Sequence, residues 1–106
     1  MRLSKEEVDN IVKALGSFST DERAELRLYG SRVDDQARGG DIDLLVLVDN
    51  QGFASKLIYQ KPEILVAIKK LLGERHVDLK IATFAELNED PFLKIIFPQS
   101  ILLHKY

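Results

Sequence analysis

Two aspartates separated by one residue, Asp41 and Asp43, have the types and spacing in this chain that most directly suggest chemistry. They open an aliphatic run that ends at Val48. On a β-strand the two side chains would share a face, with their Cα atoms about 6.5–7 Å apart. Two ionised carboxylates at that separation repel by about 2–3 kcal/mol at an effective dielectric constant near 20. The pair therefore predicts a divalent-cation site.

Two further features extend this prediction. Asp78 stands near the start of another apolar strand, in the same relative position as the first pair. Gly30 and Ser31 form a turn whose backbone N–H groups and hydroxyl could hold phosphate oxygens. Carboxylate oxygens are ligands that Mg²⁺ prefers, and three of them at strand ends suit a two-metal transfer of a phosphoryl or nucleotidyl group. Asp78 is then expected to accept the proton of the attacking hydroxyl.

Hydrophobic periodicity predicts the elements that position these residues. The spacing of Ser4 and Glu7 is that of a capping box, and Thr83 and Glu86 repeat it. The central strand, aliphatic on both faces, is expected to be covered on both sides. The predicted elements are a helix over 4–15, strands over 25–29, 42–48 and 76–83, a helix over 53–72, short helical turns after Thr83 and Asp90, and an edge strand over 101–104. This order predicts an α/β sheet with helices packed on it.

The predicted helix over 53–72 has one proline, Pro62, which is expected to mark the first turn of its stronger part. Residues 49–52 are predicted to form a turn before it. The apolar stripe of this helix is predicted to lie in the core; its members are Ile64, Leu65, Ile68, Leu71 and Leu72.

The size and composition of the chain limit the classes of function that it can have. The chain has 106 residues and is expected to form one domain over 1–106. A net charge of −2 gives no general field for nucleic acid, which ranks an RNA-modifying role lowest. The absence of cysteine excludes disulfides and thiolate zinc sites. With no long apolar run at the N-terminus or elsewhere, the expected location is cytoplasmic.

The stretch LYGSRVDDQARGGDIDLLV resembles the signature of the nucleotidyltransferase superfamily, which includes DNA polymerase β and kanamycin nucleotidyltransferase. The length of the chain is similar to that of the minimal nucleotidyltransferases. The resemblance implies a mixed β-sheet of three or four strands with helices packed on it. It also implies an adenylyltransferase-like, Mg²⁺-dependent enzyme that moves a nucleoside monophosphate from ATP or another nucleoside triphosphate to an acceptor hydroxyl.

The same resemblance assigns residues and a partner. It implies that Gly30 and Ser31 bind the triphosphate and that Asp41, Asp43 and Asp78 bind the metal ions. Members similar to this chain often have an arginine after the serine, here Arg32, which suits a phosphate contact. Small proteins of this type often pair with an all-helical HEPN protein and act as antitoxins.

The function and several of these residues also have a simpler interpretation. The alternative function is a non-catalytic binding protein of the same fold that neutralises a HEPN-type partner by contact. Lys80 shares the face of Asp78, yet a structural ion pair with a nearby carboxylate is the favoured interpretation. His76 and His104 match no metal-ligand spacing and are predicted to be structural. Arg32 could equally be a solvated side chain.

Overall fold

A computed structural model describes residues 3–18, 22–30, 41–73 and 75–106. In the described part of the chain, none of the helices has the length and apolar character needed to cross a membrane. The helices are α1 (Lys5–Gly16), α2 (Gln51–Tyr59), α3 (Lys61–Leu72) and α4 (Pro91–Ile96), with short 3₁₀ turns η2 (Phe84–Asn88) and η3 (Phe97–Gln99). The strands are β1 (Ala24–Tyr29), β2 (Ile42–Val48), β3 (Val77–Thr83) and β4 (Ile101–Lys105).

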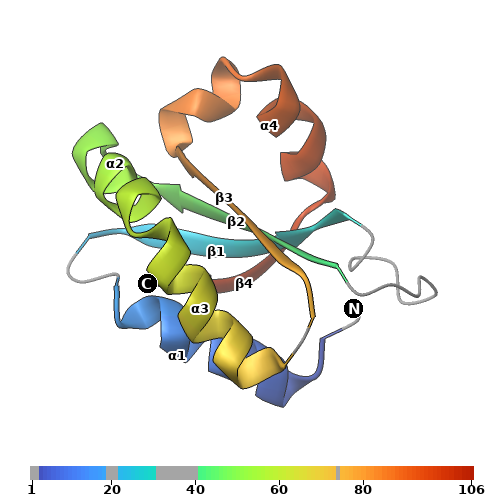
Figure 1. The fold of residues 1–106 in the computed structure, drawn as a ribbon. Coiled ribbons are helices and arrows are strands. Elements are labelled where there is room, and N and C mark those ends of the chain that lie inside the picture. The colour runs from blue at the N-terminus through green and yellow to red at the C-terminus, as the bar shows by residue number, and fades with distance from the viewer. Residues whose placement is uncertain (1–2, 19–21, 31–40, 74) are drawn as a thin grey trace.

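The four strands form one mixed sheet in the order β3-β2-β1-β4 (Figure 1). β2 and β3 are parallel, whereas β1 is antiparallel to both β2 and β4. A parallel pair needs a long crossover, and α2 and α3 supply it between β2 and β3. The predicted mixed α/β sheet and the predicted edge strand at the C-terminal end are confirmed.

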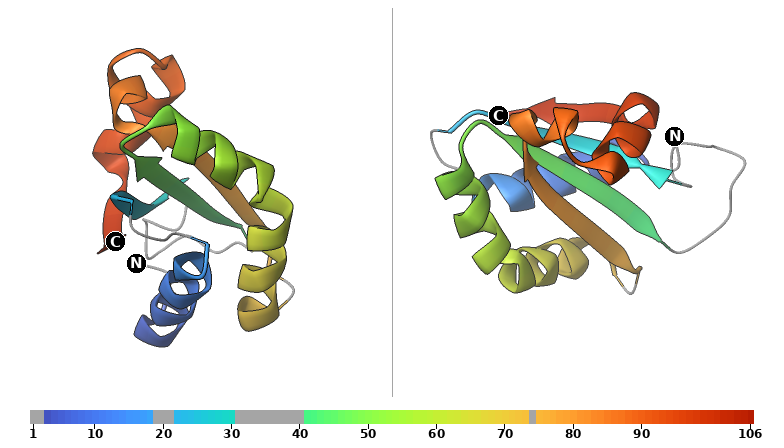
Figure 2. Two further views of the ribbon diagram at one scale, coloured as in Figure 1. Left: turned by 90° about the vertical axis from the view of Figure 1, so that its left-hand side faces the viewer. Right: turned by 90° about the horizontal axis from the view of Figure 1, so that it is seen from above.

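Two apolar layers cover the sheet, one on each face. Leu44, Val46 and Val48 of β2 belong to the core beneath α1, α2 and α3. Leu45 and Leu47 point to the other face, where the core includes side chains of α4. Figure 2 shows α1 and α3 on one side of the sheet and α4 on the other. The prediction that this strand is covered on both sides is confirmed.

Side-chain caps begin the first helix and the first 3₁₀ turn as predicted. Ser4 Oγ accepts a hydrogen bond from the Glu7 N–H at 3.1 Å, and Glu7 Oε1 accepts one from the Ser4 N–H at 2.9 Å. Thr83 and Glu86 make the same reciprocal pair at η2. Each pair satisfies backbone donors that the helix itself leaves without partners.

The single helix predicted over 53–72 is wrong in one respect: two helices, α2 and α3, occupy this segment and meet at Gln60. Pro62 lies in the first turn of α3, as predicted. A proline has no N–H to donate, and its ring clashes with the carbonyl four residues earlier, so a helix that runs through it is kinked or broken. The turn predicted over 49–52 is also shorter, because Asn50 Oδ1 accepts from the Phe53 N–H at 2.6 Å and α2 begins at Gln51.

The predicted apolar stripe of α3 is only partly in the core. Ile64 and Ile68 are buried, and Leu65 and Leu72 pack against the core from its edge. Leu71, however, keeps 48% of its surface exposed, so the prediction that it is buried is wrong. It lies in the last turn of α3, where it borders a groove between α1 and α3 instead of the sheet.

The last residue, Tyr106, ties β4 and β1 to α1. Its N–H donates to the Ala24 carbonyl at 2.8 Å, and its hydroxyl donates to the Val12 carbonyl at 2.7 Å. Burial raises the pKa of the Tyr106 hydroxyl well above its usual value of 10.0, so the phenol stays protonated and remains a donor.

We expect Tyr106→Phe to lower the free energy of unfolding by about 1 kcal/mol, because the Val12 carbonyl loses a donor in a partly buried place. Urea denaturation followed by circular dichroism measures this change. Tyr59→Phe is the matched control, since Tyr59 is 87% exposed and its substitution should leave stability unchanged. Equal stability of the two variants would contradict a stabilising role for the Tyr106 hydroxyl.

Candidate active site

The pairing of β2 with β3 brings two of the predicted carboxylates together. Asp43 lies opposite Asp78 in the register of these parallel strands, and Tyr29 of β1 lies opposite Asp43. Adjacent strands are about 4.8 Å apart, so residues in register on one face are neighbours. Asp43 is half-buried and Asp78 is exposed. The row Tyr29–Asp43–Asp78 therefore crosses the sheet at the start of β2 and β3.

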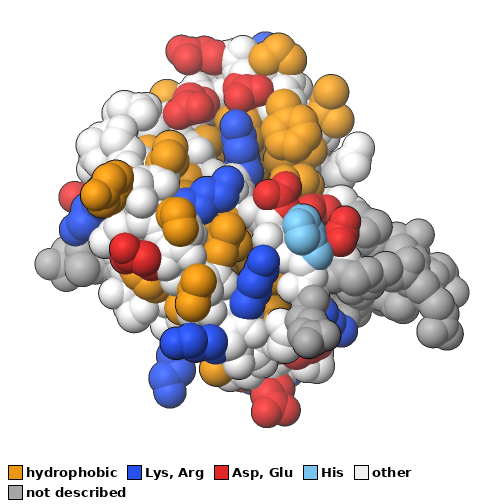
Figure 3. Space-filling view, viewed as in Figure 1, with side chains coloured by type: hydrophobic (Ala, Val, Ile, Leu, Met, Phe, Trp, Pro, Cys, Tyr) orange, Lys and Arg blue, Asp and Glu red, His pale blue; other side chains and the backbone are white. Residues whose placement is uncertain are grey.

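Asp41 lies just before this row. β2 begins at Ile42, so Asp41 directly precedes the strand, as the predicted bounds of 42–48 imply. Its Oδ1 atom is 3.5 Å from Nδ1 of His76, and both side chains are 66% exposed. The Ile42 N–H donates to the His76 carbonyl at 2.8 Å, which holds the starts of the two strands together. Figure 3 shows acidic side chains gathered beside a histidine at this edge of the molecule.

Sequence reasoning missed the contact of His76 with Asp41. A signal for this contact was present in the sequence: His76 precedes Asp78 by two residues, as Asp41 precedes Asp43. Once the two strands pair in parallel register, the residues that lie two positions earlier also become neighbours. The other histidine, His104, packs its ring against Tyr106, with 4.5 Å between the ring centroids, and has a structural role as predicted.

The negative charges of Asp43 and Asp78 affect the pKa of Tyr29. Burial, then the charge of Asp43 and then that of Asp78 raise the pKa of the Tyr29 hydroxyl from 10.0 to about 12. A phenolate in this place would be both poorly solvated and repelled by two carboxylates. Tyr29 is 8% exposed, and its ring meets Phe92 of α4 edge-on at 6.1 Å between centroids. The phenol therefore stays neutral beside the carboxylates.

Gly30 ends β1 directly against Asp43. Its φ of 75° lies in the left-handed region, which side chains other than glycine disfavour. A Cβ atom at this position would overlap Oδ2 of Asp43 and lie 3.3 Å from its Cγ. The glycine thus meets two demands at once, a left-handed turn and close approach to a carboxylate. Ser31 and Arg32, predicted to bind phosphate with it, lie outside the described residues.

Lys80 lies two residues after Asp78 on the same face of β3. Its Nζ atom is 3.9 Å from Oδ2 of Asp90 and 6.0 Å from the ring centroid of Phe92. Asp90 also caps α4 by accepting from the Phe92 N–H at 2.8 Å. The structural ion pair predicted for Lys80 is confirmed, and it fastens α4 to the sheet beside Tyr29.

The donor set fits a divalent cation. Asp43 and Asp78 offer hard carboxylate oxygens from neighbouring positions of the sheet. Both raise the pKa of Tyr29, so the charges of both carboxylates act on the same side chain. Asp41 adds a third carboxylate just before β2. Within the described ranges, however, no group of three or more His, Asp or Glu side chains is already assembled as a metal site. The part of the site that the structure describes is thus a pair of carboxylates with Asp41 close along the chain.

Comparison with protein-family models matches this chain to a known domain. The family model described as "Nucleotidyltransferase domain" matches residues 7–104. The match runs from α1 into β4 and so includes Gly30, Asp41, Asp43 and Asp78. A search of curated proteins found no significant match.

We expect Asp43→Asn and Asp78→Asn each to lower the pKa of Tyr29 from about 12 toward 10, because each removes one nearby negative charge. Nuclear magnetic resonance of ¹³Cζ-labelled tyrosine follows this titration. In the wild type the folded state holds the Tyr29 proton more tightly than the unfolded state. Its contribution to stability is therefore complete below pH 10 and is lost as the pH rises to about 12.

Asp49→Asn is the control for these two variants, since it makes the same chemical change just past the other end of β2. A Tyr29 pKa that stays near the wild-type value in both test variants would rule out the electrostatic coupling.

We expect Gly30→Ala and Gly73→Ala to lose similar stability, about 1–2 kcal/mol, because both glycines have left-handed φ angles. Only Gly30→Ala should move the Asp43 carboxylate, since a Cβ at Gly73 would meet nothing within 4 Å. Urea denaturation measures the stability of both variants, and the Tyr29 pKa reports the position of Asp43. If the Tyr29 pKa is the same in the two variants, Gly30 does not set the position of Asp43.

Proposed function

The chain belongs to the nucleotidyltransferase domain family, and on this premise we propose that it transfers AMP from ATP to an acceptor hydroxyl in a Mg²⁺-dependent reaction. The observation that carries the proposal is the pairing of Asp43 with Asp78 in register, with the Gly30 turn against Asp43. Two adjacent carboxylates beside the Gly30 turn suit a triphosphate and its cations. We propose a cytoplasmic location for this activity.

The proposed reaction forms one bond and breaks one. The oxygen of the acceptor hydroxyl bonds to the α-phosphorus of ATP. The bond from that phosphorus to the oxygen that bridges to the β-phosphate breaks, and pyrophosphate leaves. Asp78, the more exposed of the two paired carboxylates, takes the hydroxyl proton. When bound, Mg²⁺ would neutralise the triphosphate charge and lower the pKa of the attacking hydroxyl.

Each residue of the site has a proposed role. Asp41 and Asp43 would hold the metal ions, with Asp78 as the third carboxylate. Gly30 and Ser31 would cradle the triphosphate, and Arg32 would contact a phosphate. Tyr29 and Gly30 support these roles from the sheet: the neutral phenol adds no further negative charge, and the missing Cβ leaves room for the Asp43 carboxylate.

We propose further that the acceptor hydroxyl belongs to a HEPN-type helical partner protein and that the chain acts as its antitoxin. One feature supports a macromolecular acceptor: Asp41 and Asp78 are exposed, so an acceptor on another molecule can reach them.

Transfer of label from α-³²P-labelled ATP to the partner tests the proposal, with Mg²⁺ and the protein purified together with that partner. We expect Asp41→Asn, Asp43→Asn and Asp78→Asn each to reduce transfer by about 100-fold or more, because each removes charge or a proton acceptor that acts at the reacting phosphate. Asp49→Asn, which removes an exposed carboxylate paired with Arg23 at 3.1 Å, should retain full transfer.

Metal binding has a readout that is independent of transfer. Mg²⁺ bound by Asp43 and Asp78 should lower the pKa of Tyr29 by neutralising both carboxylates. If the wild type transfers no label and all three variants still neutralise the partner, the chain is a non-catalytic binding protein and the enzymatic proposal is wrong.

A further inference from the structure

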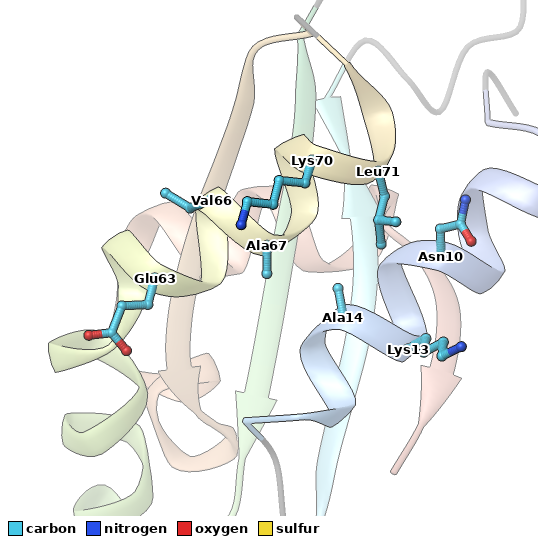
Figure 4. A pocket seen from close by; sticks show the side chains of 8 residues that line it. All are labelled: Asn10, Lys13, Ala14, Glu63, Val66, Ala67, Lys70 and Leu71. Carbon is cyan, nitrogen blue, oxygen red and sulfur yellow. The ribbon is translucent and has the colours of Figure 1, made fainter.

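A groove between α1 and α3 lies on the sheet face opposite Tyr29 and its neighbours. It has a volume of about 460 Å³. Its apolar lining includes Val66 and Leu71, which are 54% and 48% exposed. Figure 4 shows small side chains in its middle, with Ala67 of α3 and Ala14 of α1 on either side. The groove is apolar in the middle because alanines line both walls there.

One helix supplies a patterned stripe along this groove. Glu63, Val66, Ala67 and Lys70 of α3 stand three, four and seven positions apart and therefore share one helical face. We call these four residues the α3 stripe. Its ends carry opposite charges, and its middle is apolar. In Figure 4 Glu63 and Lys70 lie toward the two ends of the stripe.

The α3 stripe is complementary to itself. Glu63 and Lys70 are equally far along the helix from the midpoint between Val66 and Ala67. An antiparallel second copy of α3, related by a two-fold axis at that midpoint, would place each Glu63 opposite a Lys70 of the other copy. Val66 and Ala67 would pack together around the axis. Such an isologous arrangement is the commonest symmetry of protein dimers.

The charges at the ends of the stripe are available for this pairing. Among the described residues, neither Glu63 nor Lys70 has an ion-pair partner, and both are exposed. An apolar centre with a charged rim is the usual composition of a protein–protein interface. Pairing of opposite charges at the rim also fixes the register between the two helices.

We propose that two copies of this chain associate through the groove between α1 and α3, with their α3 helices antiparallel. The inference does not rest on the proposed function. Because this layer covers the face opposite Tyr29, Asp43 and Asp78, both copies keep their carboxylates accessible. The dimer therefore presents two separate sites on its outer faces.

Analytical ultracentrifugation over a concentration series tests the dimer. Glu63→Lys and Lys70→Glu should each raise the dissociation constant at least about tenfold, because each single variant creates two like-charge pairs across the axis. The double variant restores both opposite-charge pairs with the charges exchanged. Its dissociation constant should return to within about threefold of the wild-type value.

Lys69→Glu is the matched control, since it makes the same charge change on the neighbouring residue of α3, outside the stripe. It should leave the dissociation constant unchanged. A wild type that stays monomeric up to about 500 µM would overturn the proposal. So would a dimer that none of these variants weakens, or one that the double variant fails to restore. Circular dichroism checks that each variant is folded.

Cross-linking gives a second measurement. The chain has no cysteine, so each introduced cysteine is the single thiol of its variant. Oxidation of Val66→Cys should produce a covalent dimer, because the two thiols would meet at the axis. Lys69→Cys, at an exposed position of α3 that does not line the groove, should remain monomeric under the same oxidation. Equal cross-linking of the two variants would contradict the proposed axis.

Discussion

The parallel pairing of β2 with β3 is the constraint on which the site depends. It places Asp43 beside Asp78, although two neighbouring carboxylates repel each other. The apolar side chains of β2 are at most 1% exposed, and each contributes about 1.5–3 kcal/mol through burial. Their sum exceeds a repulsion of a few kcal/mol, so the core holds the two charges together. In the proposed function, a cation bound by the two carboxylates would relieve this repulsion.

The two faces of the sheet have different roles. One face carries α1, α2 and α3 and most of the core, while the other carries α4 and the row from Tyr29 to Asp78. The Lys80–Asp90 pair and the Tyr29–Phe92 contact fasten α4 beside the carboxylates. A second copy on the α3 stripe would therefore leave the site open, and so the proposed association and the proposed transfer can be tested separately.

Much of this arrangement could be predicted because its causes are local. The sequence predicted correctly the capping boxes at Ser4 and Thr83 and the aliphatic strand β2. The predictions that were wrong concern packing between elements. Leu71 follows the apolar period of α3 yet lies beside α1, beyond the cover of the sheet. The contact of His76 with Asp41 was missed, because it arises only when β2 and β3 pair.

The sequence by itself determined the types of group at the site: three aspartates at strand starts and a glycine turn, with the aliphatic runs that bury the strands. Spacing along one strand is set by the backbone, so a sequence carries it directly. Only the tertiary structure decided that Asp78 stands opposite Asp43, that Gly30 has no room for a Cβ, and that Tyr29 is held neutral. These facts depend on register between distant segments, and that register is fixed by packing of the whole core.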